Sequence, residues 1–253
     1  MYYFASDMHL GSGSPEESRA RELAVVEWLD RGAPTAKGIF LVGDVFDFWH
    51  EYKRVVPKGF TRLLGKLSEL TDKGVEIHFF AGNHDMWQRD YLEKECGIKV
   101  HLGGEEMELY GKKVHIEHGD EIYARKIGGA TRLMNAIFRS RTTRWLFANF
   151  IHPDCALKFG QGWSHSSRKS KDVALPFMGL DDPMIEWARK RANKGTNEGA
   201  DEGAIDYFVF GHNHCAEVLT LPEGPKVICL GHWFCNPVFG QLAPDGTLTL
   251  EKV

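Results

Sequence analysis

Cysteine is scarce in this chain and follows no pattern that builds a disulfide framework. The 253 residues include five cysteines. They are Cys96, Cys155, Cys215, Cys229 and Cys235. Their number is odd and no two have C-x-x-C spacing, which argues against a cysteine-rich secreted scaffold and against a zinc knuckle. We therefore expect a protein of the reducing cytoplasm.

Long apolar runs and internal repeats are also missing. No stretch approaches the roughly 18–20 consecutive apolar residues of a membrane-spanning helix, so we expect any membrane contact to be peripheral. The first apolar run, residues 2–6, leads directly into Asp7 and leaves no room for a signal peptide, so we expect the mature chain to begin at Met1. With 43% apolar residues, the length fits a single elaborated domain over residues 1–253.

Strong net charge is absent from the whole chain but present in one segment. The formal net charge is −4, yet residues 122–171 hold ten Lys or Arg against one acidic residue, which makes the segment +9 and the remainder −13. This segment also carries apolar residues at helical spacing. We expect an inserted basic, helical lid over residues 122–171. Its apolar side chains either pack within a helical hairpin or line a groove.

The sequence does contain five short blocks rich in metal-binding side chains. They are Ser6-Asp7-Met8-His9, Gly43-Asp44, Gly82-Asn83-His84-Asp85, His118-Gly119-Asp120 and Gly211-His212-Asn213-His214. A single Asp-x-His or His-x-His is most often a turn or a polar pair. Five such blocks in order, mostly at the ends of strand-like runs, indicate one shared site.

The apolar runs before these blocks predict the fold class. They predict buried strands at residues 2–6, 38–42, 75–81, 113–117 and 206–210. Amphipathic stretches predict helices around residues 16–31, 58–73 and 181–194. This alternation is typical of an α/β fold with a parallel or mixed sheet flanked by helices. In such folds ligands bind outside the carboxyl ends of the strands, where these blocks fall.

The blocks combine carboxylate, imidazole and amide ligands. The candidate metal ligands are Asp7, His9, Asp44, Asn83, His118, His212 and His214. This mixture suits Mn²⁺, Fe²⁺ or Zn²⁺ better than Mg²⁺ or Ca²⁺. Seven ligands are too many for one ion, whereas two ions roughly 3.5–4 Å apart can share a carboxylate and clamp both oxygens of a displacement at phosphorus.

From residue 6 to residue 214 the blocks resemble the motifs of the calcineurin-like metallophosphoesterases. Those motifs are Asp-x-His, Gly-Asp-x-x-Asp, Gly-Asn-His-Asp/Glu, His and Gly-His-x-His, and every position is filled here. The resemblance implies a four-layer αββα sandwich with a helical lid insertion. It implies a metal shell of Asp7, His9 and His214 for one ion, a shell of Asn83, His118 and His212 for the other, and Asp44 as the bridge.

The same resemblance implies two catalytic residues outside the metal shell. His84 is expected to contact the phosphoryl group or to protonate the leaving oxygen. Asp47, three residues after the bridging Asp44, is expected to orient the His84 imidazole, as a carboxylate commonly does. For Asp85 and Asp120 we expect support of the ligands rather than metal binding.

Other features resemble the narrower family of UDP-2,3-diacylglucosamine diphosphatases of lipid A synthesis. They are Gly43–Trp49, the insert after Asp120, and the polar run Ser164–Lys169. This resemblance implies Mn²⁺-dependent cleavage of a nucleotide-sugar lipid to UMP and 2,3-diacylglucosamine 1-phosphate, by a peripheral enzyme on the cytoplasmic face of the inner membrane. By analogy the headgroup contacts are Asp120, Tyr123, Asn149, Ser164, Ser167, Arg168 and Lys171.

Two positions depart from the narrower family. His84 stands where well-known members carry Arg, and Gly231-His232-Trp233 stands where Gly-Asp-Trp is expected. A paralogue that acts on another nucleotide or lipid-linked phosphoester is therefore an alternative. A non-catalytic scaffold is a weaker one, because no metal ligand is missing. Nucleic-acid binding is disfavoured by the net charge of −4 and by the lack of an aromatic-rich recognition motif beside the basic lid.

Overall fold

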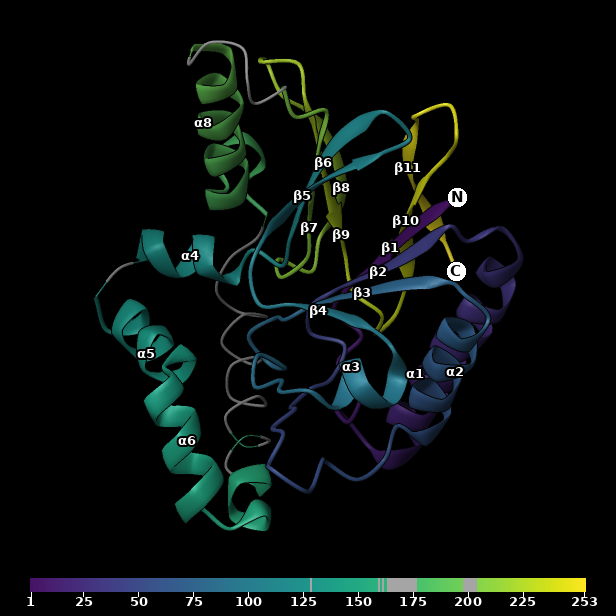
Figure 1. The fold of residues 1–253 in the computed structure, drawn as a ribbon. Helices are drawn as coiled ribbons and strands as arrows, with labels where there is room; N and C mark the ends of the chain where they lie inside the picture. The colour runs from purple at the N-terminus through teal and green to yellow at the C-terminus, as the bar shows by residue number, and fades with distance from the viewer. Residues whose placement is uncertain (128, 159, 161, 163–176, 198–203) are drawn as a thin grey trace.

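The computed structural model of the chain describes residues 1–127, 129–158, 160, 162, 177–197 and 204–253 (Figure 1). Four of the expected headgroup contacts, Ser164, Ser167, Arg168 and Lys171, lie outside the described residues.

Two mixed β-sheets form the body of the molecule (Figure 1). The strands of the first are β1 (Tyr2–Ala5), β2 (Gly38–Val42), β3 (Glu76–Phe80), β4 (Lys99–His101), β10 (Val238–Leu242) and β11 (Leu248–Lys252). The strands of the second are β5 (Glu105–Leu109), β6 (Lys112–Glu117), β7 (Tyr207–Phe210), β8 (Ala216–Thr220) and β9 (Lys226–Leu230). Their orders are β11-β10-β1-β2-β3-β4 and β5-β6-β7-β9-β8. The strands that precede the motif blocks are parallel within each sheet.

Alternate side chains of the strands fill the space between the two sheets. Successive side chains on a strand point to opposite faces, so Phe4 of β1 and Phe40 of β2 both turn inward. Their rings stack with centroids 4.8 Å apart. Val209 of β7 and Ile228 of β9 belong to the same buried cluster from the second sheet. The two sheets therefore pack face to face.

Helices cover the outer face of each sheet. The helices are α1 (Pro15–Gly32), α2 (Thr61–Asp72), α3 (Tyr91–Cys96), α4 (Asp120–Ile127) and α8 (Pro183–Asn197), with 3₁₀ turns at Ala33–Thr35 and Gly179–Asp181. The first three share a buried cluster with Ile39 and Leu41 on the outer face of the first sheet. The start of α4 and α8 pack against Phe208 and Phe210 of the second. The predicted four-layer αββα sandwich is confirmed.

Local signals in the sequence explain where these elements begin. Ser14 and Glu17 form a reciprocal capping box at the start of α1, with Pro15 in its first turn. Leu63 and Leu67 lie one turn apart on the buried face of α2. The three predicted helices are found as α1, α2 and α8, and the five predicted strands end within one residue of the predicted bounds.

Two further helices, α5 (Gly129–Arg139) and α6 (Arg141–Phe150), lie within the expected lid and stand beside the sandwich (Figure 1). Their inner side reaches the body through Phe138 and Phe147, which pack against a small buried cluster that contains Trp87. Large apolar side chains of α5, of α6 and of the residue after α6 are exposed. These are Leu133, Ile137, Trp145, Leu146, Phe150 and Ile151. Among the described residues, no helix combines the length and apolar character needed to cross a bilayer.

Candidate metal centre and active site

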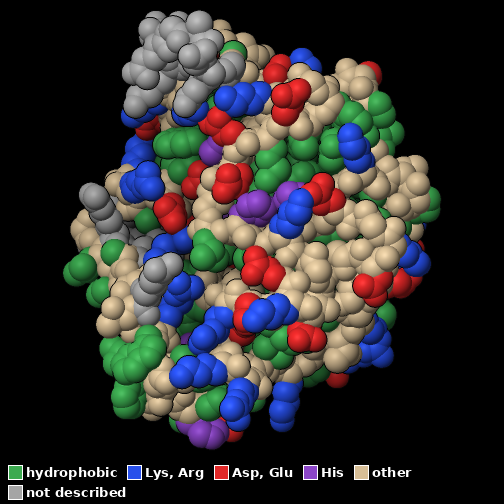
Figure 2. Space-filling view, in the orientation of Figure 1, with side chains coloured by type: hydrophobic (Ala, Val, Ile, Leu, Met, Phe, Trp, Pro, Cys, Tyr) green, Lys and Arg blue, Asp and Glu red, His purple; other side chains and the backbone are tan. Residues whose placement is uncertain are grey.

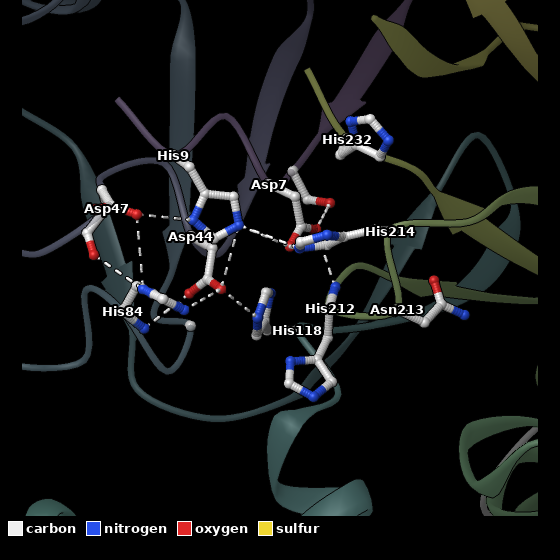
Figure 3. Close-up of polar contacts among 12 residues, drawn as sticks. Asp7, His9, Asp44, Asp47, His84, His118, His212, Asn213, His214 and His232 are labelled. Carbon is white, nitrogen blue, oxygen red and sulfur yellow. Dashed lines mark hydrogen bonds and ion pairs between the residues drawn. The ribbon is translucent and has the colours of Figure 1, made fainter. Parts of the chain in front are cut away.

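Six of the seven predicted metal ligands converge at one edge of the sandwich (Figure 3). Each follows the end of β1, β2, β6 or β7. The parallel strands of both sheets bring their carboxyl ends to this edge, which is why residues far apart in the chain meet there. Three groups could each hold a metal ion: Asp7, His9 and His214; Asp44, His118 and His212; and His9, Asp44 and His84. The first two of these share no residue. The seventh residue, Asn83, follows β3 and has a buried side chain.

Asp44 lies between the two groups and is completely buried. Its Oδ1 accepts a hydrogen bond from the backbone N–H of His84 at 2.9 Å. Its Oδ2 is 3.3 Å from Nε2 of His118 and 3.9 Å from Nε2 of His9. One carboxylate oxygen is thus fixed by the backbone, and the other faces imidazole nitrogens from both groups. The second oxygen is therefore accessible to side chains of both groups.

Asp7 is held in a similar way in the other group. Its Oδ2 accepts hydrogen bonds from Ser6 Oγ at 2.5 Å and from the backbone N–H of His212 at 2.9 Å. Its Oδ1 is 3.2 Å from Nε2 of His214 and 3.7 Å from Nε2 of His9. The two imidazole nitrogens are themselves 3.2 Å apart. A carboxylate oxygen and two ring nitrogens therefore face the same point.

The backbone is left-handed at five of the seven predicted ligands. The φ angles are 53° at Asp7, 44° at His9, 53° at Asp44, 67° at His212 and 56° at His214. For residues with a Cβ this conformation costs roughly 1–2 kcal/mol each, and it persists where the surroundings impose it, often at functional sites. Hydrogen bonds between the loops impose it here, such as His9 N–H to Asp44 O at 2.9 Å.

Two motif glycines allow the loops to approach this closely. A Cβ on Gly82 would lie 2.2 Å from Asp44 Oδ1 and 2.6 Å from the Asp44 backbone nitrogen. A Cβ on Gly211 would lie 2.7 Å from Ser6 Oγ and 2.8 Å from Asp7 Oδ2. Any side chain at these positions would displace a carboxylate of the centre, so the glycines are required by packing.

The electrostatics of the centre favour bound cations. Burial raises the pKa of Asp7, but the close imidazoles of His214 and His9 outweigh it and hold the pKa well below its usual value. Burial lowers the pKa of His118, but the charge of Asp44 outweighs it and raises that pKa. Among the described residues, Asp7 Oδ1, Asp44 Oδ2, Asn83 Oδ1 and His118 Nε2 are buried and make no hydrogen bond. Such atoms are rare. Oxygen and nitrogen donors of this kind fit a pair of divalent transition-metal ions.

His84 lies beside the centre, and its contact with Asp47 differs in detail from the prediction. Its Nδ1 donates to the backbone carbonyl of Asp47 at 2.9 Å, while the Asp47 carboxylate oxygen Oδ1 is 4.0 Å away. That carboxylate oxygen is nearer to Nδ1 of His9, at 3.6 Å. His84 Nε2 is 3.9 Å from Asp44 Oδ2. Asp47 therefore orients the His84 ring through its main chain, and its carboxylate lies behind His9.

The three described residues predicted to contact a headgroup have protein partners. The Asp120 carboxylate accepts a hydrogen bond from Arg139 of α5 at 2.7 Å. The Tyr123 hydroxyl donates to Asp182 at 2.5 Å, and burial together with Asp182 raises the Tyr123 pKa. Asn149 is exposed and donates to the carbonyl of its own helix at Trp145, at 2.6 Å. Asp120 and Tyr123 thus tie α4 to neighbouring elements.

Two residues beside the centre, Phe234 and Arg21, lie in none of the motif blocks. Phe234 stacks on the His9 ring with centroids 5.5 Å apart, and the Arg21 guanidinium lies 4.8 Å from the Phe234 ring centroid. Arg21 also donates to the carbonyl of Ser12 at 2.6 Å. The one available signal was the Gly231-His232-Trp233 departure two residues earlier, because Phe234 itself lies in no motif block.

An apolar pocket opens beside Asn83 and His84, between the body and the lid. Its cavity volume is about 30 Å³. Its lining is Phe48, Trp49, Asn83, His84, Met86, Trp87, Phe138 and Gly160. All of these except Asn83, His84 and Gly160 are large apolar side chains. The centre therefore adjoins a space suited to an apolar part of a ligand.

Asp85 joins the loops after β2 and β3. Its buried carboxylate accepts backbone hydrogen bonds from Gly82 at 2.8 Å and from Val45 at 2.8 Å, with longer ones from Asp44 and Phe46 at 3.3 Å each. Burial and the charge of Asp44 raise the Asp85 pKa. The predicted supporting role fits these contacts.

Replacement of Asp85 by Ala should destabilise the fold. Four buried N–H groups would lose their acceptor, so we expect the free energy of unfolding to fall by about 2–4 kcal/mol in urea titrations of the metal-free protein. Asp85→Asn keeps one carbonyl oxygen and should lose less. Asp90→Ala, an exposed change nearby, is the matched control. Equal stability of Asp85→Ala and this control would contradict the role.

Several curated proteins are similar to this chain over most of its length. A UDP-2,3-diacylglucosamine hydrolase of Porphyromonas gingivalis is 40% identical, with 99% of this chain and 97% of that protein covered. One from Aeromonas salmonicida is 30% identical, with coverage of 91% and 85%. One from Histophilus somni is 23% identical, with coverage of 96% and 97%.

The family model described as calcineurin-like phosphoesterase matches residues 2–216, a span that contains every metal-binding block. With this match, and with the arrangement of carboxylates and imidazoles at the edge of the two sheets, the chain belongs to the calcineurin-like phosphoesterase family.

Proposed function

We propose that this protein hydrolyses UDP-2,3-diacylglucosamine at its pyrophosphate and releases UMP and 2,3-diacylglucosamine 1-phosphate in lipid A synthesis. The observation that carries the proposal is the relative named for this substrate, which is 40% identical over 99% of the chain. The centre supports it, because the site offers ligands for two divalent ions beside an apolar pocket. Phosphate-bond hydrolysis is the activity of the family to which the chain belongs.

The proposed cofactors are two divalent ions, Mn²⁺ first and Fe²⁺ or Zn²⁺ otherwise. The proposed ligands are Asp7, His9 and His214 for one ion, Asn83, His118 and His212 for the other, and Asp44 for both. When bound, such ions supply positive charge to the phosphoryl oxygens and acidify a water molecule. His118 is aligned for this role, because its Nδ1 donates to the carbonyl of Val42 at 2.9 Å and leaves Nε2 toward Asp44.

His84 is the proposed acid or phosphoryl contact. Because its Nδ1 donates to the Asp47 carbonyl, Nε2 carries a proton only when the ring is charged. Its Nε2 lies 3.9 Å from the Asp44 carboxylate. A charged imidazole here can hold an oxygen of the phosphoryl group or give a proton to the leaving oxygen. Asp47 fixes the ring through its carbonyl.

The substrate's lipid half suits the apolar pocket and the lid. The acyl chains would pack against side chains such as Trp49 and Met86. Further headgroup contacts proposed by analogy are Asp120, Tyr123, Asn149, Ser164, Ser167, Arg168 and Lys171. For Asp120 and Tyr123 this contact requires exchange of the present hydrogen bonds with Arg139 and Asp182.

The outer surface of α5 and α6 is the proposed contact with the cytoplasmic face of the inner membrane. Six large apolar side chains are exposed there, and Phe150 is the most open of them at 71%. Lys and Arg side chains gather on the same side of the molecule (Figure 2). Apolar side chains beside cations suit a bilayer surface with anionic lipids. A soluble substrate, the main alternative, accounts for neither the apolar pocket nor this surface.

The reaction itself can be tested by phosphorus NMR of UDP-2,3-diacylglucosamine incubated with the Mn²⁺-loaded protein in oxygen-18 water. We expect UMP to appear, with the label on a single phosphorus that identifies the site of attack. Bis-p-nitrophenyl phosphate serves as the generic substrate. Turnover of this diester without release of UMP would reject the proposed substrate and keep the family chemistry.

Two substitutions should separate metal binding from proton transfer. Asp44→Ala should lose bound Mn²⁺ and turnover together, because it removes the proposed bridge. His84→Ala should lower kcat by about 10²–10⁴-fold, the usual contribution of an acid or base, and keep most of its Mn²⁺. Metal content by mass spectrometry and kcat are measured on both, with His152→Ala in the exposed lid as control. Loss of both ions from His84→Ala would assign it to the metal shell instead.

Removal of the exposed aromatic side chains should weaken membrane binding. The double variant Trp145→Ser, Phe150→Ser should bind vesicles of phosphatidylethanolamine and phosphatidylglycerol about 100-fold less tightly or worse, since each buried aromatic contributes about 1.5–3 kcal/mol. Leu23→Ser, at an exposed apolar position on α1, is the matched control. Co-sedimentation measures both. Unchanged binding of the double variant would place the membrane contact elsewhere.

A further inference from the structure

The centre has two ends that differ in character, and each is marked by a histidine outside the proposed metal shell. His84 lies beside Asp44 at one end, and His232 lies beyond His214 at the other (Figure 3). The rings of His232 and His214 have centroids 5.6 Å apart. A substrate with two unlike halves joined by a diphosphate can therefore be sorted by the chemistry of each end.

The His84 end is enclosed and apolar. The pocket that begins at Asn83 and His84 continues between Trp49, Met86 and Trp87, all buried. Apolar surface removed from water contributes roughly 25 cal/mol per Å², so acyl chains gain most at this end. A nucleotide gains little here, because its polar groups would lose water and find few partners.

The His232 end is open and polar. His214 and His232 are only half buried, and Cys235 and Asn236 farther along the same loop are exposed. At this end a polar group keeps its contact with water.

The loop that carries His232 is firmly anchored. The backbone N–H of Trp233 donates to the carbonyl of Asp7 at 3.2 Å, and the Trp233 ring packs in the core against Trp28 with centroids 5.4 Å apart. The next residue, Phe234, stacks on His9. The contacts of the next two residues, Trp233 and Phe234, thus hold His232 at a fixed distance from the centre.

The hydrogen bonding of His232 makes its ring a donor. Its Nδ1 accepts the backbone N–H of Phe234 at 3.1 Å, so the neutral ring carries its proton on Nε2. An N–H donor beside His214 is suited to an anionic phosphate oxygen, where such a hydrogen bond is stronger than one between neutral groups.

We propose that the site binds its diphosphate substrate in one orientation, with the acyl chains at the His84 end and the nucleotide at the His232 end, where His232 donates to the phosphate of the UMP half. The inference rests on the proposed function and adds a direction and a specificity-determining residue to it. His232 thereby favours the orientation in which the UMP half lies at the open end of the centre.

The orientation predicts opposite effects of two substitutions on the two product halves. His232→Ala should weaken UMP binding by about 10- to 100-fold, the range for a hydrogen bond to a charged group, and leave binding of a short-chain diacylglucosamine 1-phosphate unchanged. His232→Gln, which keeps a side-chain donor, should recover part of the affinity. Met86→Trp fills the apolar pocket and should weaken only the lipid half. Calorimetry on Mn²⁺-loaded proteins of matched metal content measures both ligands.

Kinetics on the same variants separate this inference from the proposed function. His232→Ala should raise KM for UDP-2,3-diacylglucosamine. If the wild-type protein cleaves the lipid but His232→Ala binds UMP normally, or if the effects of His232→Ala and Met86→Trp are reversed, the orientation is wrong and the function stands. If the wild-type protein does not cleave the lipid, the proposed function itself is rejected. If the wild-type protein is active but does not bind UMP, the orientation is rejected. If Met86→Trp destabilises the protein, Phe48→Trp at the same pocket takes its place as the variant that fills the pocket.

Discussion

The burial of the Asp44 carboxylate between two sets of imidazoles is the constraint on which the rest of this structure depends. A buried carboxylate is costly unless positive charge or hydrogen bonds compensate it. One Asp44 oxygen has such compensation from the backbone of His84, and the other faces His118 and His9. The protein therefore builds a place for cations where the two sheets meet, and the fold positions every other ligand around that place.

The loops that carry the ligands gain their rigidity from one another. Asp85 accepts backbone hydrogen bonds from both loops, and Gly82 permits them to approach to within contact of Asp44. Left-handed backbone at Asp7 and Asp44 is unfavourable in isolation, and these cross-loop contacts maintain it. Cross-loop contacts of this kind hold the ligand side chains in fixed positions, which reduces the cost of metal binding and of catalysis alike.

The metal centre defines a class of chemistry, and its surroundings define the substrate. The same dimetal arrangement can serve many phosphoesters, so specificity comes from what adjoins it. Here an apolar pocket adjoins one end, an open polar surface with His232 adjoins the other, and a lid with exposed apolar side chains extends beyond the pocket. An amphiphilic diphosphate fits these three features together. Each of them alone would fit many ligands.

The sequence by itself determined the class of the fold, the strands that end at the site and the ligand types, because these depend on local periodicity and on short motifs. Tertiary structure alone decided which oxygen of Asp47 meets His84, that Tyr123 hydrogen-bonds to Asp182, and that Phe234 packs on His9. Such contacts join segments that no local pattern relates: Phe234 follows His9 by 225 positions and reaches it because β1 pairs with β10 in the first sheet. Side-chain direction at such meetings depends on how whole layers pack, and that information is distributed over the entire core.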